Sequence, residues 1–160
     1  MTLYTPHGAH QADVANIIPP QAPGLLAVQA GLASDHGWCP IKPETFESTA
    51  VADVHVIGDA CIADPMPKAA SSATAQATQC ALSIVASLAG QEPPEPRFES
   101  VCYSRLAPDS ALSIHGRYRL ADSAIRQITG LEDPGAGRST QEARNADDWY
   151  SRIVRDSFGA

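Results

Sequence analysis

Short clusters of apolar residues, separated by glycine and proline, organise the first part of the sequence. Apolar residues alternate or cluster over residues 2–5 and 12–18, which predicts a β-hairpin or two successive short strands. A short helix is predicted between Pro23, which suits a first helical turn, and Gly31, which ends it. The chain is therefore expected to open with small elements.

A short apolar strand is predicted over residues 53–60, where it breaks at Gly58, and Asp59 lies directly beyond the break. Ligands of open α/β sheets gather beyond the carboxyl ends of strands, and a carboxylate there can accept hydrogen bonds from ribose or ribityl hydroxyls. A long Ala-rich helix is predicted from about residue 69 to residue 88. Its apolar residues recur at helical spacing and predict one packed face, made of Ala73, Ala77, Cys80, Ile84 and Leu88.

The pattern changes after residues 91–96, a Pro- and Glu-rich segment with the composition of a linker. We therefore predict a boundary there between two structural units, residues 1–95 and residues 96–160. Beyond the linker, alternating apolar residues predict three strands of an antiparallel sheet, over residues 98–103, 111–118 and 124–128.

The last part of the chain predicts a loop and then a helix. Residues 130–139 contain three glycines and a proline, as loops do. Ser139 or Thr140 can cap the following helix, with Glu142 in its first turn. An apolar stripe recurs along that helix, at Ala146, Trp149 or Tyr150, Ile153 and Phe158. The predicted fold class is α+β, with a strand-helix part followed by an antiparallel sheet and a terminal helix.

Charge and composition exclude several classes of function. The net charge is −7 and the eleven basic residues are scattered, which argues against nucleic-acid binding because phosphates require clustered Lys and Arg. No run approaches the roughly 20 apolar residues that cross a bilayer, and residues 1–6 lack the pattern of an export signal. The cysteines are spaced too widely for a CxxC pair, so no metal site is predicted among Cys39, Cys61, Cys80 and Cys102.

Six blocks of residues are informative when they are considered together and in their order along the chain. They are residues 17–20 (Ile-Ile-Pro-Pro), 37–40 (Gly-Trp-Cys-Pro), 45–48 (Thr-Phe-Glu-Ser), 55–68 (from His-Val-Ile-Gly-Asp to Pro-Met-Pro-Lys), 102–104 (Cys-Tyr-Ser) and 149–159. Together they closely resemble the flavoprotein subunit of flavocytochrome c sulfide dehydrogenase, a pyridine nucleotide-disulfide oxidoreductase type of family. The resemblance is specific, because a lone Gly-Asp pair occurs in many flavoproteins whereas these blocks in this order belong to few.

The resemblance implies FAD as the cofactor, with Gly58, Asp59, Pro67 and Lys68 as cofactor-binding residues. Asp59 would bind the flavin ribityl chain, while Lys68 and the N-terminus of the following helix would favour the negative charge of a reduced flavin. It also implies that Cys102 is the second member of a redox-active cysteine pair that sulfide attacks. The family oxidises sulfide by two electrons, which leave one at a time to a c-type cytochrome subunit.

The sequence also departs from the family. It contains no Gly-x-Gly-x-x-Gly segment, which cradles the FAD pyrophosphate, and neither Cys39 nor Cys61 matches the first redox cysteine or the flavin-attaching cysteine. Residues 69–74 lack a glycine and an aromatic ring that the family places near the flavin. We therefore expect a truncated chain, in which residues 1–95 are the C-terminal part of an FAD-binding domain and residues 96–160 are the flavin-binding and interface domain, and which is not catalytic alone.

The candidate site residues also have simpler structural interpretations. Asp59 can cap a turn or the next helix, Cys102 can be a buried small hydrophobe, and Lys68 can be a solvated charge. The whole chain can instead be a non-catalytic module that pairs with itself, with an N-terminal half or with a cytochrome, and we expect a homo-oligomer because an uncovered apolar face drives association. The family works in the periplasm, whereas the absence of an export signal leaves the cytoplasm as the alternative location.

Overall fold

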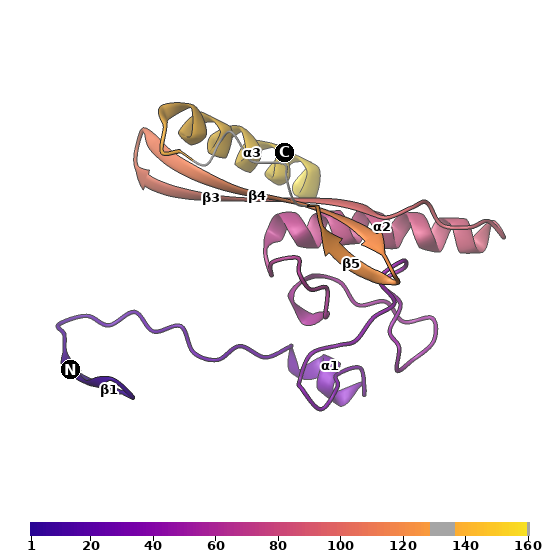
Figure 1. Cartoon of the computed structure of the whole chain (residues 1–160), viewed down its shortest axis with the longest axis horizontal. Coiled ribbons are helices and arrows are strands. Elements are labelled where there is room, and N and C mark those ends of the chain that lie inside the picture. The colour runs from indigo at the N-terminus through magenta and orange to yellow at the C-terminus, as the bar shows by residue number, and fades with distance from the viewer. Residues whose placement is uncertain (129–136, 160) are drawn as a thin grey trace.

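The computed structural model describes residues 1–128 and 137–159, so most of the predicted loop over residues 130–139 lies outside the described residues. The chain contains a two-stranded sheet, a three-stranded sheet and three α-helices within those residues (Figure 1). In chain order the elements are β1 (Thr2–Thr5), β2 (Gly8–Gln11), α1 (Leu25–Gln29), the 3₁₀ helix η1 (Gly58–Ala60), α2 (Ala70–Leu88), β3 (Arg97–Ala107), β4 (Ser110–Ala121), β5 (Ala124–Gln127) and α3 (Thr140–Phe158). The predicted α+β class is confirmed.

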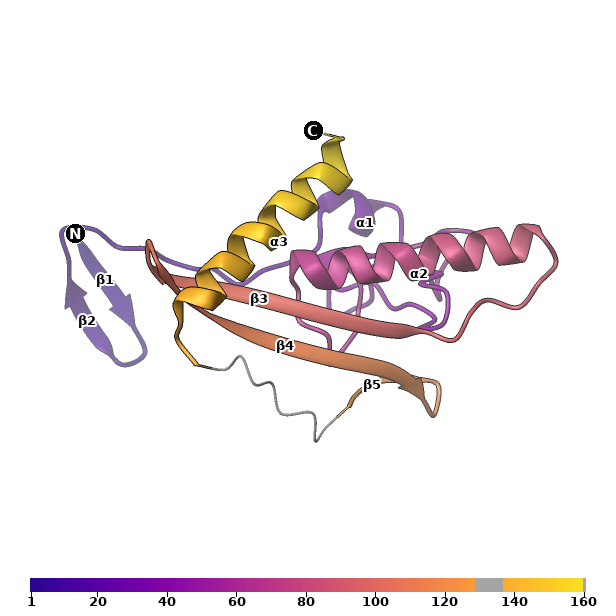
Figure 2. The same cartoon turned by 90° about the horizontal axis from the view of Figure 1, so that it is seen from above.

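The N-terminal hairpin is shorter than predicted. β1 and β2 pair antiparallel in the register Thr2↔Gln11, so the chain turns back at once after Thr5. The prediction of a second strand over residues 12–18 is wrong, because among the described residues only Ala12, which bonds to the backbone of Met1, continues the pairing of the hairpin, and Ile18 is exposed. Figures 1 and 2 show the hairpin at one end of the molecule, joined to the rest by this extended segment. The short helix α1 is confirmed, and Gly31 adopts a left-handed φ of 70° directly after it.

The C-terminal sheet and helix follow the sequence pattern closely. β3, β4 and β5 form an antiparallel sheet in that order, with Phe98 opposite Tyr118. Helix α3 begins as predicted at Ser139, whose hydroxyl accepts a hydrogen bond from the Glu142 N–H at 3.1 Å. It lies along one face of the sheet, where Trp149 meets Tyr103 of β3 with ring centroids 6.1 Å apart (Figure 2). Tyr150 and Phe158 of the predicted stripe are exposed, because α3 turns only its Trp149 side toward the sheet.

Helix α2 has the predicted length but buries a face that shares only Cys80 with the predicted one. Its buried side chains are mostly polar, namely Ser72, Gln76, Gln79, Cys80, Ser83 and Ala86, whereas Leu88 of the predicted face is 84% exposed. The reason is that this face packs against irregular chain, whose backbone groups need partners. The Gln79 amide donates to the Glu44 and Pro94 carbonyls at 3.1 and 3.0 Å, and the Ser83 hydroxyl donates to the Glu44 carbonyl at 3.2 Å.

The first turn of α2 is tied to the outer edge of β3. The Ser71 hydroxyl donates to the Val101 carbonyl at 2.8 Å and accepts from the Val101 N–H at 3.0 Å. These two bonds replace those of a neighbouring strand, which an edge strand otherwise lacks. The start of α2 is therefore held in a defined position against the sheet.

The main core lies between α2, the three-stranded sheet and residues 30–69, an irregular segment whose only helix is η1. It contains Cys39, Phe46, Val56, Cys61, Ala63, Met66, Cys80, Phe98, Tyr118 and Ile125. Phe46 and Phe98 are fully buried and meet edge to face, with ring centroids 5.7 Å apart and an interplanar angle of 86°. They come from opposite sides of the predicted boundary at residues 91–96, so side chains of the two predicted units share this core. None of the described helices has both the length and the apolar character needed to cross a membrane.

Candidate functional site

The four predicted cofactor-binding residues lie together at the start of α2. Gly58, Asp59, Pro67 and Lys68 line one small pocket, whose other lining residues are Cys61, Ala63, Asp64, Met66, Ala69, Ser72, Ala73 and Gln76. The structure therefore brings these four residues together, and their role in cofactor binding stays a prediction. The prediction of a strand leading into the site is wrong, because the segment before Gly58 forms only a single bridge, between His55 and Glu47. The positive φ angles of Asp53 and Gly58 interrupt the extended conformation on either side of this bridge.

Gly58 fixes the turn that carries the site. Its φ of 70° lies in the left-handed region, which favours glycine, and a Cβ added here would lie 3.6 Å from the Ala73 Cβ. The Gly58 N–H donates to the Gln76 side-chain oxygen at 2.7 Å. Backbone conformation and one hydrogen bond to α2 thus hold this turn against the helix.

Lys68 is an organising residue rather than only a solvated charge. Its ammonium group donates to the carbonyl of Asp59 and, at 3.0 Å, to the carbonyl of Cys61. The same Nζ atom lies 3.9 Å from the centroid of the Trp38 ring, which is a cation–π contact. Lys68 therefore joins the Trp38 segment to the loop between Gly58 and α2.

The predicted alternative role of Asp59 as a cap is not observed. Neither η1 nor α2 has a side-chain cap hydrogen bond, and α2 starts at the N-cap residue Ala69, which has no polar side chain. The Asp59 side chain is exposed, and no hydrogen bond of the described residues uses its carboxylate. The hydroxyl of Ser72 is buried without a hydrogen-bond partner among the described residues. The pocket thus combines an exposed carboxylate, an ammonium group and an uncapped helix N-terminus.

Cys102 lies apart from this pocket. It stands in β3 opposite Ile114 and is partly buried, and it is not among the residues that line the Gly58–Lys68 pocket. None of the four cysteines, all of which lie in the described part of the chain, forms a disulfide. The described residues also contain no cluster of three or more His, Cys, Asp or Glu suited to a metal ion.

A second, larger hollow lies on the face of the sheet that α3 covers, and Cys102 is not among its lining residues. It has a volume of about 440 Å³ and is lined from β3 and β4, from α3 and from the first turn of α2. Its lining includes Val101, Tyr103, His115, Trp149 and Arg152. The sequence pattern predicts Trp149 in the apolar stripe of the last helix and does not group these lining residues. Side chains alternate between the two faces along β3, so Val101 and Tyr103 lie on one face, and this alternation is the sequence feature that could have predicted part of the grouping.

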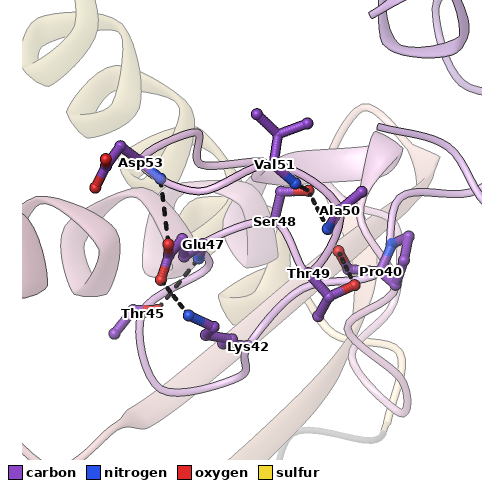
Figure 3. Close-up of polar contacts among 9 residues, drawn as sticks. All are labelled: Pro40, Lys42, Thr45, Glu47, Ser48, Thr49, Ala50, Val51 and Asp53. Atoms are coloured by element: carbon purple, nitrogen blue, oxygen red, sulfur yellow. Dashed lines mark hydrogen bonds and ion pairs between the residues drawn. The ribbon is translucent and has the colours of Figure 1, made fainter. Parts of the chain in front are cut away.

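The segment that precedes the site is organised by polar contacts of its own. Figure 3 shows Glu47 between Lys42 and Asp53, where its carboxylate accepts from the Lys42 ammonium at 2.6 Å and from the Asp53 N–H at 3.2 Å. The Ser48 hydroxyl accepts from the Ala50 N–H at 3.1 Å. The hydrogen bond from Lys42, followed by the one from Asp53, lowers the pKa of Glu47.

Stability is expected to depend on the charge of Glu47. Because the folded-state pKa is lowered, the contribution of Glu47 to stability is present above its unfolded-state pKa of about 4.3 and is lost as the pH falls through the folded-state pKa. Urea unfolding should therefore show Glu47→Gln less stable than the parent at neutral pH, with the difference shrinking on acidification. Lys42→Met should also lose most of this pH-dependent stability, because it removes the ammonium group that contributes most to the lowered pKa of Glu47. A gap between parent and Glu47→Gln that stays constant on acidification would contradict this assignment.

A comparison with known protein families connects the C-terminal part of this fold with flavin-binding proteins. Residues 94–158 match the family model described as flavocytochrome c sulphide dehydrogenase, flavin-binding. The C-terminal part of the chain is therefore similar to the flavin-binding domain of flavocytochrome c sulphide dehydrogenase, as the sequence resemblance predicted. The match covers β3, β4, β5 and α3, and the Gly58–Lys68 pocket lies before it.

Proposed function

We propose that this chain is the C-terminal flavin-binding part of an FAD-dependent sulfide dehydrogenase and that it is not catalytic alone. The observation that carries the proposal is the joint position of Gly58, Asp59, Pro67 and Lys68 around one pocket, next to a part of the chain that is similar to the flavocytochrome c sulphide dehydrogenase family.

The residues at this pocket suit one edge of a flavin rather than a whole FAD molecule. The cavity itself holds about 10 Å³, which is room for no more than a single water. Its chemistry is nevertheless appropriate, because the uncapped N-terminus of α2 and the Lys68 ammonium favour negative charge, and Ser72 offers a buried hydroxyl without a partner. A dinucleotide would need further contacts for its pyrophosphate and adenosine.

Each residue has a proposed task. Gly58 lets the backbone turn close to α2, Asp59 accepts hydrogen bonds from the ribityl hydroxyls, and Lys68 provides positive charge next to the isoalloxazine. FAD, when bound, accepts two electrons and releases them one at a time. Cys102 would supply the thiol that exchanges with a partner cysteine outside this chain, with sulfide as the reductant and a c-type cytochrome as the electron acceptor.

Flavin binding can be tested with the purified chain. We expect FAD fluorescence to be quenched saturably on titration and a flavin absorption band to be retained after gel filtration. Lys68→Met should weaken FAD binding about tenfold, because it removes the ammonium group at the start of α2. The matched control is Lys42→Met, which loses the same charge at a distance from the pocket, and circular dichroism should show that both variants are folded.

Two results would overturn the proposal. One is a chain that stays colourless and leaves FAD fluorescence unchanged. The other is equal FAD affinity of Lys68→Met and the parent, which would show that any bound flavin lies elsewhere. The claim that the chain is not catalytic alone is tested separately, by adding sulfide and a c-type cytochrome to the FAD-loaded chain, where no cytochrome reduction above the protein-free rate is expected.

A second candidate function is a non-catalytic module that pairs with a second copy of itself. It is favoured by the exposed apolar side chains of α1, where Leu26 is 79% exposed and Leu25 and Val28 are also exposed. Apolar groups gathered in this way promote association. Light scattering after gel filtration is expected to give the mass of a dimer, and Leu26→Glu is expected to give the mass of a monomer. A parent chain that is monomeric at all concentrations would contradict this function.

A further inference from the structure

Two buried cysteines of the core lie side by side although they are far apart in the sequence. Cys39 and Cys61 are 0% and 1% exposed and are partners in a parallel β-bridge. The Cys39 N–H donates to the Ala60 carbonyl at 2.9 Å, and the Ile62 N–H donates to the Cys39 carbonyl at 2.8 Å. The two hydrogen bonds flank Cys61 and hold its backbone directly beside that of Cys39.

This backbone geometry allows a disulfide. Bridge partners on neighbouring strands are separated by about 4.8 Å and direct their side chains to the same side. Disulfides join cysteines whose Cα atoms are about 4.4–6.8 Å apart, so the pair can be linked without a large backbone movement. The other two cysteines, Cys80 in α2 and Cys102 opposite Ile114 in β3, have no cysteine as a pairing partner among the described residues.

The surroundings of the pair indicate a structural bond rather than a fast-exchanging one. Burial raises the pKa of both thiols, to about 11 for Cys61, and the nearby Lys68 ammonium opposes this rise only in part. Few thiolates are therefore present at neutral pH, and a bond once formed is shielded from attack. The Cys61 thiol presently donates to the Gly58 carbonyl at 3.2 Å, so the reduced side chain is accommodated as well.

We infer that Cys39 and Cys61 form a disulfide when the protein meets a thiol-oxidising environment, and that this bond locks the loop between Gly58 and Lys68 against the Trp38 segment. The inference does not depend on the proposed flavin function and does not involve Cys102. With oxidised glutathione as the oxidant, the two cysteine S–H bonds and the glutathione S–S bond break, and one Sγ–Sγ bond forms. Two electrons pass to glutathione, and the two released glutathione thiols carry the two protons.

Peptide mapping of the full chain tests this inference. The protein is incubated with oxidised glutathione in mildly alkaline solution, denatured, alkylated, and digested with trypsin together with an endoproteinase that cuts after glutamate. Cleavage after Glu44 and Glu47, after Lys68, and after Arg97 and Glu99 places the four cysteines on four different peptides. The expected product is a covalent pair of the peptides that contain Cys39 and Cys61, with Cys80 and Cys102 alkylated.

Matched variants sharpen the result. Cys80→Ala should leave the linked peptides unchanged, whereas Cys39→Ala should abolish them and leave Cys61 alkylated or carrying one glutathione. The oxidised parent should also unfold roughly 5–10 °C higher than the reduced parent, as expected for a cross-link that closes a loop of this size in a small protein. Alkylation of both Cys39 and Cys61 in the oxidised parent, or linkage of either to Cys80 or Cys102, would overturn the inference whether or not the variants fold.

Discussion

Phe98→Ala is expected to lower the free energy of unfolding by about 3–5 kcal/mol, the range for removing a large aromatic side chain from a packed core. Phe98 is 1% exposed and contacts Phe46 edge to face, so its loss leaves a cavity between β3 and the irregular segment that carries Phe46. Urea unfolding followed by circular dichroism measures the change. The effect should be large because the Phe46–Phe98 contact joins β3 to the segment that carries Phe46, and the core between them contains few other aromatic residues.

The control for this variant is Phe158→Ala. Phe158 is 80% exposed near the end of α3, so its removal should change the unfolding free energy by less than about 0.5 kcal/mol. Equal effects of the two substitutions would show that Phe98 is not a core residue. The same experiment bears on the boundary predicted at residues 91–96, because two units that fold independently would unfold in two transitions, of which Phe98→Ala would shift only one.

Gly116→Ala is expected to destabilise the sheet by about 2–3 kcal/mol, as overpacking of a well-filled site does. A Cβ at Gly116 would lie 2.1 Å from the Tyr118 hydroxyl oxygen and 2.6 Å from the ring carbon that bears it. Tyr118 is buried and its hydroxyl lies 3.4 Å from that of Ser100, so the ring would have to leave its position and lose these contacts. The melting temperature and the near-ultraviolet tyrosine signal should both change.

Gly24→Ala provides the comparison for Gly116→Ala. A Cβ at Gly24 meets no atom within 4 Å, and its φ of −56° is open to any residue. We expect this variant to unfold at nearly the temperature of the parent. If Gly116→Ala behaved in the same way, the ring of Tyr118 could not lie over Gly116 in solution.

The elements that the sequence predicts well are those whose stabilising pattern is local. β3 alternates exposed and buried residues over its first four positions and β4 does so over part of its length, and α3 carries its cap at Ser139 and its first-turn Glu142 within four residues. The strand predicted over residues 53–60 failed because strand formation depends on a neighbour, and the sequence does not show that His55 finds only one bridge partner. The same limit applies to residues 12–18.

The buried face of α2 could not be predicted for a different reason. Periodicity arguments assume that a helix packs against apolar side chains, whereas Gln79 and Ser83 meet the carbonyl of Glu44. At the site, the family resemblance selected Gly58, Asp59, Pro67 and Lys68, which line one pocket in the structure. The contact of Lys68 with the Trp38 ring was not predicted, because it joins residues from separate blocks of the sequence.

The polar buried face of α2 fixes the position of this helix more strictly than an apolar face would. An apolar contact allows small rotations and shifts of a helix, because one methyl group can take the place of another at little cost in free energy. Hydrogen bonds are directional, so the bonds from Gln79 and Ser83 to the chain around Glu44 hold α2 at one rotational setting and one axial position. Gln76, one to two turns earlier in the helix, shares that setting, and its hydrogen bond to the Gly58 N–H passes it on to the turn at Gly58.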